Sequence, residues 1–297
     1  MATAPASDIF LDQSDWREAP LRVDQTIFAI GDVHGCHGQL AVLLDTFKAL
    51  ARSGSARLIF LGDLICRGPN SLAALSLWAA PALEQRFARV HRLSGNHEQL
   101  MMLSIGDDET LARAAYHKWM AIDGGTFVDE LRRASGRRDA SLTRELLHET
   151  AGPEILAQLE TLEYSVRIGN TIFVHGGLDP SVNASMALAA PFTAFGGNHW
   201  AWIQEPFLAW RGGFGGAMVV HGHTPPPKHR MMSGYPDPHV FQHDRLSLDG
   251  GSALTGIVAG AQVENGRNRL FRASLPSPNI DHMSAAISRS SSPSASR

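Results

Sequence analysis

Residues 26–35 read TIFAIGDVHG, an apolar, β-branched run that ends in a glycine and an aspartate. Leucines and a phenylalanine then recur three or four residues apart over 40–50, which predicts an amphipathic helix. The same strand-to-loop pattern returns in RLIFLGD (57–63) and RVHRLSGNHE (89–98). Repeated units of strand, glycine-containing loop and helix predict an α/β fold with parallel strands.

The rest of the chain adds helices and further strands. The signals over about 98–162 are mostly helical, with a break at Asp123-Gly124-Gly125, and they predict a helical insert lying over or beside the sheet. Residues 164–175 are typical of a hairpin around a Gly-Asn turn. More strands are expected in the segments AMVVHGH, RLSLDGG, GIVAGAQV and NRLFRA.

The ends of the chain differ from its middle in composition. Residues 1–22 are polar and predict an irregular N-terminal arm, while the Ser-rich segment 274–297 predicts a disordered tail. One domain is expected between them, over 23–273. With 44% hydrophobic residues the whole chain can bury a sizeable core, which excludes wholesale disorder.

Charge and cysteine content exclude several classes of protein. With a net charge of −3, the chain lacks the excess of positive charge that favours non-specific binding to nucleic acid or to an anionic membrane. Cys36 and Cys66 cannot build a disulfide framework, which favours a reducing compartment. The first residues lack the pattern of a signal peptide, and no apolar run reaches the length of a membrane helix. A cytoplasmic location is therefore expected.

Polar loops that follow apolar strands carry the candidate chemistry. They are residues 31–35, 62–68, 95–98, 175–177 and 220–223. Each loop alone is a weak signal, because a glycine after a strand usually marks only a tight turn. Together they place carboxylate, amide and imidazole groups at the strand ends where layered α/β folds bind ligands.

The donor types in these loops predict metal binding. Oxygen and imidazole donors without a thiolate suit Mn, Zn or Fe. Asp32 and His34 lie two residues apart on an extended segment, so both side chains can point to one side. The set is too large for one tetrahedral site, and a carboxylate shared by two cations would explain it. Two such ions form a clamp for the attacking and leaving oxygens of a phosphoryl displacement.

The ordered set GDVHG, GDxxxRGP, GNHE, HGG and GHTP resembles the phosphoprotein phosphatase branch of the calcineurin-like metallophosphoesterases. The resemblance spans residues 27 to about 260. It implies an α/β fold made of a two-sheet β-sandwich flanked by helices, in place of a plain parallel sheet. It also implies two divalent metal ions at the sheet edge, manganese first and iron or zinc as alternatives.

The resemblance also implies a role for individual residues. His97 would be the proton donor to the leaving group, and Arg67 would bind the phosphate oxygens. His221 is interpreted as a structural residue rather than a ligand. Asp63 would bridge the ions, with Asp32 and His34 on the first metal. The implied metal ligands are Asp32, His34, Asp63, Asn96, His175 and His223.

Two positions depart from the family pattern. Cys66 stands where protein phosphatases of the family usually carry an aspartate that orients the catalytic histidine. A non-acidic residue there, followed by Arg-Gly-Pro, is instead similar to the symmetrical diadenosine tetraphosphate hydrolases. Gln204 stands where bacterial protein phosphatases often carry a phosphate-binding arginine, and Arg211 is the candidate replacement.

The leading hypothesis is a di-metal phosphatase acting on phosphate monoesters, foremost phosphoserine or phosphothreonine in proteins. Its implied mechanism is in-line attack of metal-bound hydroxide with His97 as general acid. One alternative is a symmetrical dinucleoside polyphosphate hydrolase, and other small phosphate esters or cyclic nucleotides are further candidates. Another is a catalytically inactive metal-binding scaffold. The expected partner is a phosphorylated protein or a small phosphate ester, with no nucleic acid and no membrane.

Overall fold

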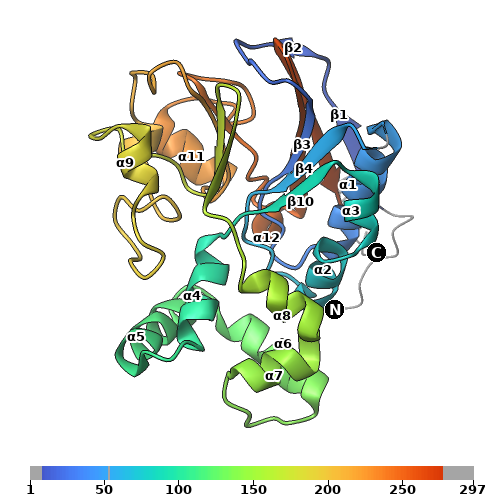
Figure 1. Ribbon diagram of the computed structural model, residues 1–297, viewed down its shortest axis with the longest axis vertical. Coiled ribbons are helices and arrows are strands. Elements are labelled where there is room, and N and C mark those ends of the chain that lie inside the picture. Colours follow the sequence, from blue (N-terminus) through green and yellow to red (C-terminus); the bar gives the residue numbers. More distant parts are fainter. Residues whose placement is uncertain (1–8, 53, 277–297) are drawn as a thin grey trace, which may run out of the picture.

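The computed structural model describes residues 9–52 and 54–276, which fold into two β-sheets with helices around them (Figure 1). Within these residues one sheet has seven strands and the other has four. The predicted α/β fold with two sheets and flanking helices is confirmed. No helix in the described ranges is long and apolar enough to cross a membrane.

The larger sheet combines a parallel centre with antiparallel flanks. Strands β3, β4 and β5 run parallel, and their registers pair Ile30 with Phe60 and Phe60 with Arg92. Their carboxyl ends therefore lie side by side at one edge of the sheet. The strands of this sheet are β1 (Phe10–Gln13), β2 (Arg17–Glu18), β3 (Thr26–Ile30), β4 (Ala56–Phe60), β5 (Arg89–Arg92), β10 (Ile257–Glu264) and β11 (Arg267–Ser274).

The smaller sheet begins with the predicted hairpin, whose strands pair antiparallel across the Gly169-Asn170 turn. The following pairs are parallel, so the ends of β7 and β8 also point toward one edge. In chain order its strands are β6 (Ser165–Ile168), β7 (Thr171–Val174), β8 (Met218–His221) and β9 (Arg245–Ser247).

The core between the two sheets follows from the alternation of side chains along each strand. In β3, Ile27 points into this core while Phe28 and Ile30 pack under the helices on the other face. Phe173 of β7 and Val220 of β8 enter the same inter-sheet core from the smaller sheet. The strands are apolar on both faces because each sheet is covered on both sides.

Helices cover the outer face of the larger sheet and form the predicted insert. Figure 1 shows the first group along the sheet and the insert at one end of the molecule. The first group is α1 (His37–Leu50), α2 (Ser71–Trp78) and α3 (Ala82–Arg86). The insert is α4 (Asn96–Ser104), α5 (Glu109–Met120), α6 (Gly125–Ser135), α7 (Arg144–Ala151) and α8 (Pro153–Leu159). The remaining short helices are α9 (Ala184–Leu188), α10 (Glu205–Leu208), α11 (Pro226–Ser233) and α12 (Ser252–Thr255).

The insert is joined to the rest of the fold by polar as well as apolar contacts. Glu130 of α6 accepts the backbone N–H groups of Ser71 and Leu72, at 2.8 and 2.9 Å. These N–H groups belong to the first turn of α2, where a helix leaves its donors unpaired. The carboxylate of Glu130 therefore fixes the insert to the helix that follows the loop at 62–68.

The N-terminal segment departs from the expected irregular arm. Its β1 pairs antiparallel with β11, with Phe10 opposite Ser274, and its β2 also pairs with β11. The β1 segment forms an edge strand because the backbone N–H and C=O groups on that side of β11 would otherwise lack partners. Of the expected disordered tail, residues 277–297 lie outside the described residues.

Candidate metal centre

The predicted loops converge where the ends of the parallel strands meet, and Asp63 lies at their centre. Two groups of side chains, found within the described residues, could each hold a cation. The Asp63 carboxylate belongs to both groups, and the ligand atoms of each group lie within 4.8 Å of one another. One group is Asp63, His34 and His97, and the other is Asp63, His175 and His223.

The histidines of these groups are oriented by backbone carbonyls. His34 Nδ1 donates to Ile65 O and His175 Nδ1 donates to Leu61 O, both at 2.9 Å. Because a carbonyl oxygen only accepts, each Nδ1 carries a proton and Nε2 is the nitrogen that faces Asp63. These Nε2 atoms lie 3.6 and 3.3 Å from an Asp63 carboxylate oxygen. Metal-binding histidines are held in this way, with one nitrogen bonded to the protein and the other free.

The electrostatics of the centre favour a cation between the carboxylate and the imidazoles. Burial alone would raise the pKa of Asp63, but the neighbouring His175 and His97 hold it well below its usual value. Burial also opposes a charge on His175, yet Asp63 raises the pKa of His175 to about 10. Burial lowers the pKa of His34 to about 4 and that of His223 to about 3, so these imidazoles are neutral near pH 7. A buried carboxylate beside neutral imidazoles fits a divalent metal such as Mn, Zn or Fe.

Asp32 and Asn96, two further predicted ligands, lie beside these groups. Asn96 Oδ1 is 3.1 Å from His175 Nε2, next to the second group. The Asp32 carboxylate instead accepts the backbone N–H of His223, at 3.0 and 3.1 Å. Burial and the charge of Asp249 raise the pKa of Asp32 well above its usual value. All six predicted ligands therefore lie at this sheet edge, although the first group of mutually close donor atoms contains His97 and not Asp32.

The loop that carries Asp63 is held by a buried carboxylate. Glu98 accepts backbone N–H groups from Asp63 at 2.7 Å and from Leu64 at 2.8 Å. It also accepts the N–H of Gly95 at 3.1 Å, which begins helix α4. A Cβ at Gly95 would collide with Asp63 Oδ1, so the close approach of the two loops needs a glycine. Glu98 thus positions the loop and does not itself belong to either donor group.

Backbone strain concentrates at the same place. Non-glycine residues with positive φ are uncommon and cost free energy, so a cluster of them indicates a functional site. Eight such residues occur in the described part of the chain, and six of them surround the centre. These six are His34, Asp63, Cys66, Arg67, Asp123 and His223.

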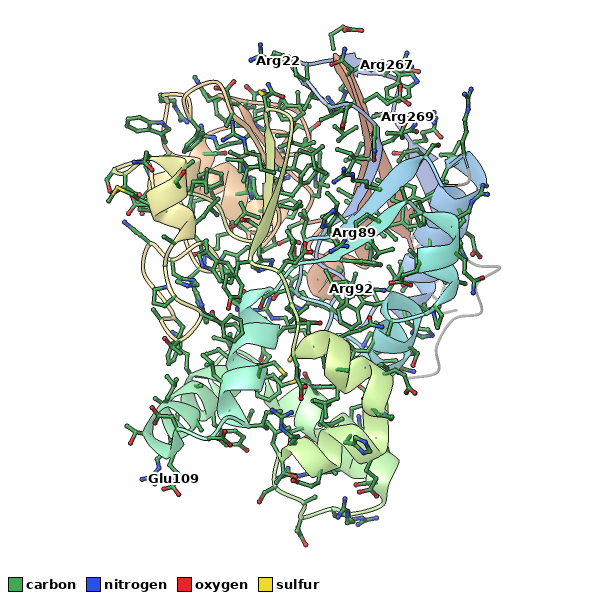
Figure 2. All side chains as sticks on the ribbon, in the orientation of Figure 1. Arg22, Arg89, Arg92, Glu109, Arg267 and Arg269 are labelled. Carbon is green, nitrogen blue, oxygen red and sulfur yellow. The ribbon has the colours of Figure 1, made fainter. Side chains whose placement is uncertain are left out.

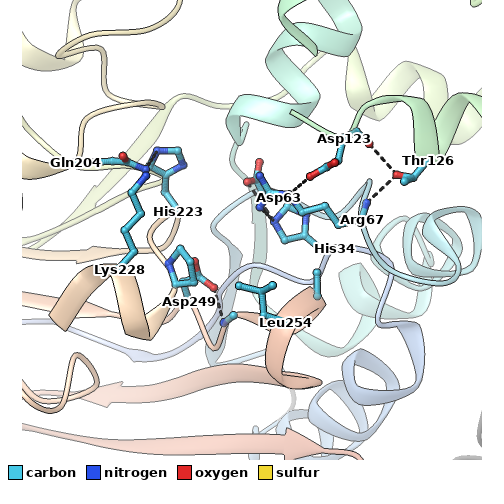
Figure 3. A pocket seen from close by; sticks show the side chains of 13 residues that line it. His34, Asp63, Arg67, Asp123, Thr126, Gln204, His223, Lys228, Asp249 and Leu254 are labelled. Atoms are coloured by element: carbon cyan, nitrogen blue, oxygen red, sulfur yellow. Dashed lines mark hydrogen bonds and ion pairs between the residues drawn. The ribbon is translucent and has the colours of Figure 1, made fainter. Parts of the chain in front are cut away.

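An open pocket of about 500 Å³ adjoins the two donor groups (Figure 3). Arg67 projects into it, with its Nη1 3.1 Å from His34 Nε2 and its Nε 3.5 Å from an Asp123 oxygen. Its backbone N–H donates to Thr126 Oγ1 at 2.8 Å. The predicted insert therefore contributes to the site, since Asp123 and Thr126 position this arginine. A guanidinium fork beside a metal centre is suited to bind phosphate oxygens.

His97, the predicted proton donor, is fully buried and lies edge-on to His34, with ring centroids 5.0 Å apart. Neither of its ring nitrogens has a hydrogen-bond partner among the described residues. Burial lowers the pKa of His97 well below its usual value. The thiol of Cys66 is buried as well, and burial raises its pKa well above the usual range. The thiol is therefore neutral and does not supply the carboxylate that the family pattern places there.

Arg211 is the predicted site residue that the structure does not bring to the centre. Its guanidinium donates to Ser233 O at 2.6 Å and lies over the ring of Tyr235. The residues that line the pocket do not include it. Gln204, in contrast, does line the pocket and lies 3.3 Å from His223 Nε2. His221 is fully buried and packs edge-on against Phe207, away from the pocket lining.

The sequence reasoning missed three charged residues of the pocket, Asp123, Asp249 and Lys228. Asp249 follows β9, and burial raises the pKa of its carboxyl to about 6. A signal was present, because Asp249 follows a predicted strand and stands next to a glycine, as Asp32 and Asp63 do, although here the glycine comes after the aspartate. Lys228 of α11 lines the pocket without any motif that could have identified it.

Comparison with known proteins is consistent with this geometry. A symmetrical bis(5'-nucleosyl)-tetraphosphatase of Methylococcus capsulatus is 33% identical over 168 residues, which cover 55% of this chain and 47% of that protein. A serine/threonine-protein phosphatase of Arabidopsis thaliana is 37% identical over 81 residues, 26% of this chain and 8% of that protein. These matches thus span less than half the length of each relative.

A solved structure of a mutant cold-active protein tyrosine phosphatase shares the fold, with a TM-score of 0.50 and 18% identity. The alignment covers 82% of this chain and 77% of that one. The profile of the calcineurin-like phosphoesterases matches residues 25–250, which include the two donor groups. The chain therefore belongs to the calcineurin-like phosphoesterase family.

Proposed function

We propose that this chain is a di-metal phosphohydrolase that cleaves the phosphoanhydride bonds of dinucleoside polyphosphates. Six ligand residues would hold the metals, with Asp63 shared between them. When bound, two divalent cations supply a water activated at neutral pH and neutralise the charge of the phosphate. The ligands for them would be Asp32, His34, Asp63, Asn96, His175 and His223.

The residues of the chain orient the substrate around this centre. Arg67 offers a planar set of donors to the scissile phosphate, and Asp123 and Thr126 keep it in place. Such a clamp stabilises charge that develops on the phosphate oxygens. The Glu98 carboxylate keeps the Asp63 loop in position through backbone N–H groups.

The isolation of His97 is the observation that favours an anhydride substrate. A serine or threonine alkoxide leaves only with a proton from a well-positioned acid. Here the expected aspartate is replaced by Cys66, and the His97 ring has no hydrogen-bond partner in the described residues. A nucleotide that leaves as a phosphate anion depends far less on that acid. The match to the tetraphosphatase relative extends over 168 residues and the match to the serine/threonine-protein phosphatase over 81, which also supports an anhydride substrate.

Hydrolysis of phosphoserine and phosphothreonine in proteins is the second candidate. The segments GNHEQLMM (95–102) and VHGHTP (220–225) favour it, because they resemble bacterial protein phosphatases. The pocket is also open enough to admit a phosphorylated side chain of a protein. This hypothesis requires His97 to protonate the leaving oxygen without a carboxylate partner.

A substrate panel with added Mn²⁺ tests both candidates. We expect diadenosine tetraphosphate to be split into ADP with a kcat/KM at least about a hundredfold above that for a phosphoserine peptide, or roughly 3 kcal/mol of discrimination. Faster release of phosphate from the peptide would overturn the proposal in favour of the second candidate. Two bound metals without hydrolysis of any member of the panel would indicate a scaffold.

A further inference from the structure

The two cationic side chains that line the pocket, Arg67 and Lys228, differ in how many partners they have within the protein. Arg67 faces Asp123 and His34, so part of its charge is offset within the protein. Lys228 lines the same pocket, and no hydrogen bond or ion pair joins its ammonium to another described residue. The two other lysines of the chain have partners, since Lys48 pairs with Asp45 and Lys118 lies over the ring of Trp202. Lys228 therefore brings an uncompensated positive charge to the pocket.

The position of Lys228 places this charge across the pocket from Arg67. In Figure 3 its side chain rises from α11 beside Gln204 and His223, while Arg67 enters from the other side. Pro226 and Pro227 begin α11, and proline at the start of a helix fixes the backbone there. The backbone of Lys228 is thus held rigidly while its long side chain stays adaptable.

We propose that Lys228 binds the phosphate groups beyond the one being attacked, and so selects polyphosphates over simple monoesters. This inference rests on the proposed function and deepens it. A phosphate chain carries a charge on every unit, and a cation on each side of the centre can hold the units on both sides of the scissile bond. Lysine suits such a role because its ammonium is a compact charge on a flexible stem.

The neutral side chain of Gln204 beside Lys228 gives this assignment its chemical reason. Gln204 lines the pocket but is neutral, and its amide lies 3.3 Å from His223 Nε2. Arg211 brings no charge to this side of the pocket, because it is held by Ser233 and Tyr235. Lys228 enters the pocket on the side of Gln204 and places a positive charge there.

Lysine footprinting tests the contact without using catalysis. The full chain, at saturating Mn²⁺ so that the ligand does not strip the metal, is acetylated with and without inorganic tripolyphosphate. Mass spectrometry then compares the three lysines. We expect tripolyphosphate to slow acetylation of Lys228 at least about fivefold, as a charge-assisted contact of this kind requires, while Lys48 and Lys118 are unaffected. Equal labelling of Lys228 with and without tripolyphosphate overturns the proposal.

Substitution adds a measurement of selectivity. Lys228→Ala should lower the ratio of kcat/KM for diadenosine tetraphosphate to that for 4-nitrophenyl phosphate about tenfold, the typical effect of losing one charged hydrogen bond. Lys228→Arg keeps the charge and should keep most of the ratio, and Lys48→Ala on α1 serves as the matched control. An unchanged ratio in Lys228→Ala overturns the proposal.

The two proposals can fail separately. If the wild-type protein splits no dinucleoside polyphosphate while tripolyphosphate still protects Lys228, the proposed function fails and the binding role of Lys228 stands. If diadenosine tetraphosphate is hydrolysed but Lys228 is neither protected nor needed for selectivity, the proposed function stands and the role of Lys228 is overturned.

Discussion

The carboxylate of Glu98 accepts the backbone N–H of Asp63 at 2.7 Å, although the two residues belong to loops that follow different strands. The same carboxylate accepts the N–H of Gly95 at the start of α4. Asn96 and His97 lie in the first turn of that helix. Glu98 therefore joins the shared carboxylate of one loop to the amide and imidazole of the next, so the two loops act as one unit.

Glu98→Gln should disturb both stability and activity. The amide group of glutamine would turn a donor toward backbone N–H groups that need an acceptor, and an unpaired buried group typically costs about 1–3 kcal/mol. We expect the free energy of unfolding in urea to fall by about 2–3 kcal/mol, together with a loss of phosphohydrolase activity. The control is Glu109→Gln at the exposed end of the insert (Figure 2), which should leave both unchanged.

Asp63→Asn should reduce the metal content of the protein. Asp63 belongs to both donor groups, and an amide lacks the negative charge that binds two cations. Mass spectrometry of the purified variant should find at least one Mn²⁺ per chain fewer than in the wild type. Asp12→Asn, which alters only an exposed ion pair with Arg272, should keep the wild-type content. Full metal content in Asp63→Asn would contradict the shared role.

His97→Gln should change the rate little, whatever the leaving group of the substrate. Loss of a working general acid typically costs about 10²–10⁴-fold in rate when the leaving oxygen needs a proton. Because no partner orients the ring of His97, we instead expect kcat to fall by less than about tenfold for both phenyl phosphate and diadenosine tetraphosphate. The measurement is steady-state kinetics at equal Mn²⁺ concentration. A fall of about a hundredfold or more for phenyl phosphate alone would show that His97 is a working general acid, and would refute the reasoning from its unpartnered ring.

His229 should make the fold sensitive to acid. Burial lowers the pKa of this histidine to about 4, and the charges of His239 and Arg245 act in the same direction. The unfolded chain thus takes up a proton below its ordinary pKa of 6.5, while the folded chain does so only near 4. Stability therefore falls as the pH drops between these values, by up to about 3 kcal/mol, and this contribution falls no further below them.

Urea unfolding at pH 7 and pH 4, in the presence of a chelator, measures this dependence. His229→Gln should lose less stability between the two pH values than the wild type does. The exposed His117→Gln on α5 provides the comparison, and it should behave as the wild type. An identical pH dependence in all three proteins would mean that other buried groups dominate the response to acid.

Much of the architecture could be predicted because it follows from local patterns. The strand-to-loop units ending at Asp32, Asp63 and Asn96 are each readable within ten residues. The strands β1 and β2 could not be predicted in this way. All four residues of β1 are exposed, so the segment shows no apolar alternation, and its partner Ser274 lies at the opposite end of the described sequence.

The candidate ligand residues could be identified from the sequence and the residues around them could not, for the same physical reason. His175 and His223 each stand next to a glycine at a strand end, which marks a loop built for close approach. Asp123 reaches the pocket from the turn between α5 and α6, and Lys228 reaches it from α11. Only tertiary packing brings these segments to the sheet edge. The placement of Arg211 on Tyr235 is likewise a tertiary contact.

The shared carboxylate comes from the larger sheet, whereas His175 and His223 follow strands of the smaller one. A cation bound by these groups would cross-link the two sheets of the sandwich. Metal loading would then be coupled to the integrity of the whole fold, since any ligand that binds only the folded state adds to its stability. A cell short of the metal would consequently hold less of this protein, and not merely a less active form of it.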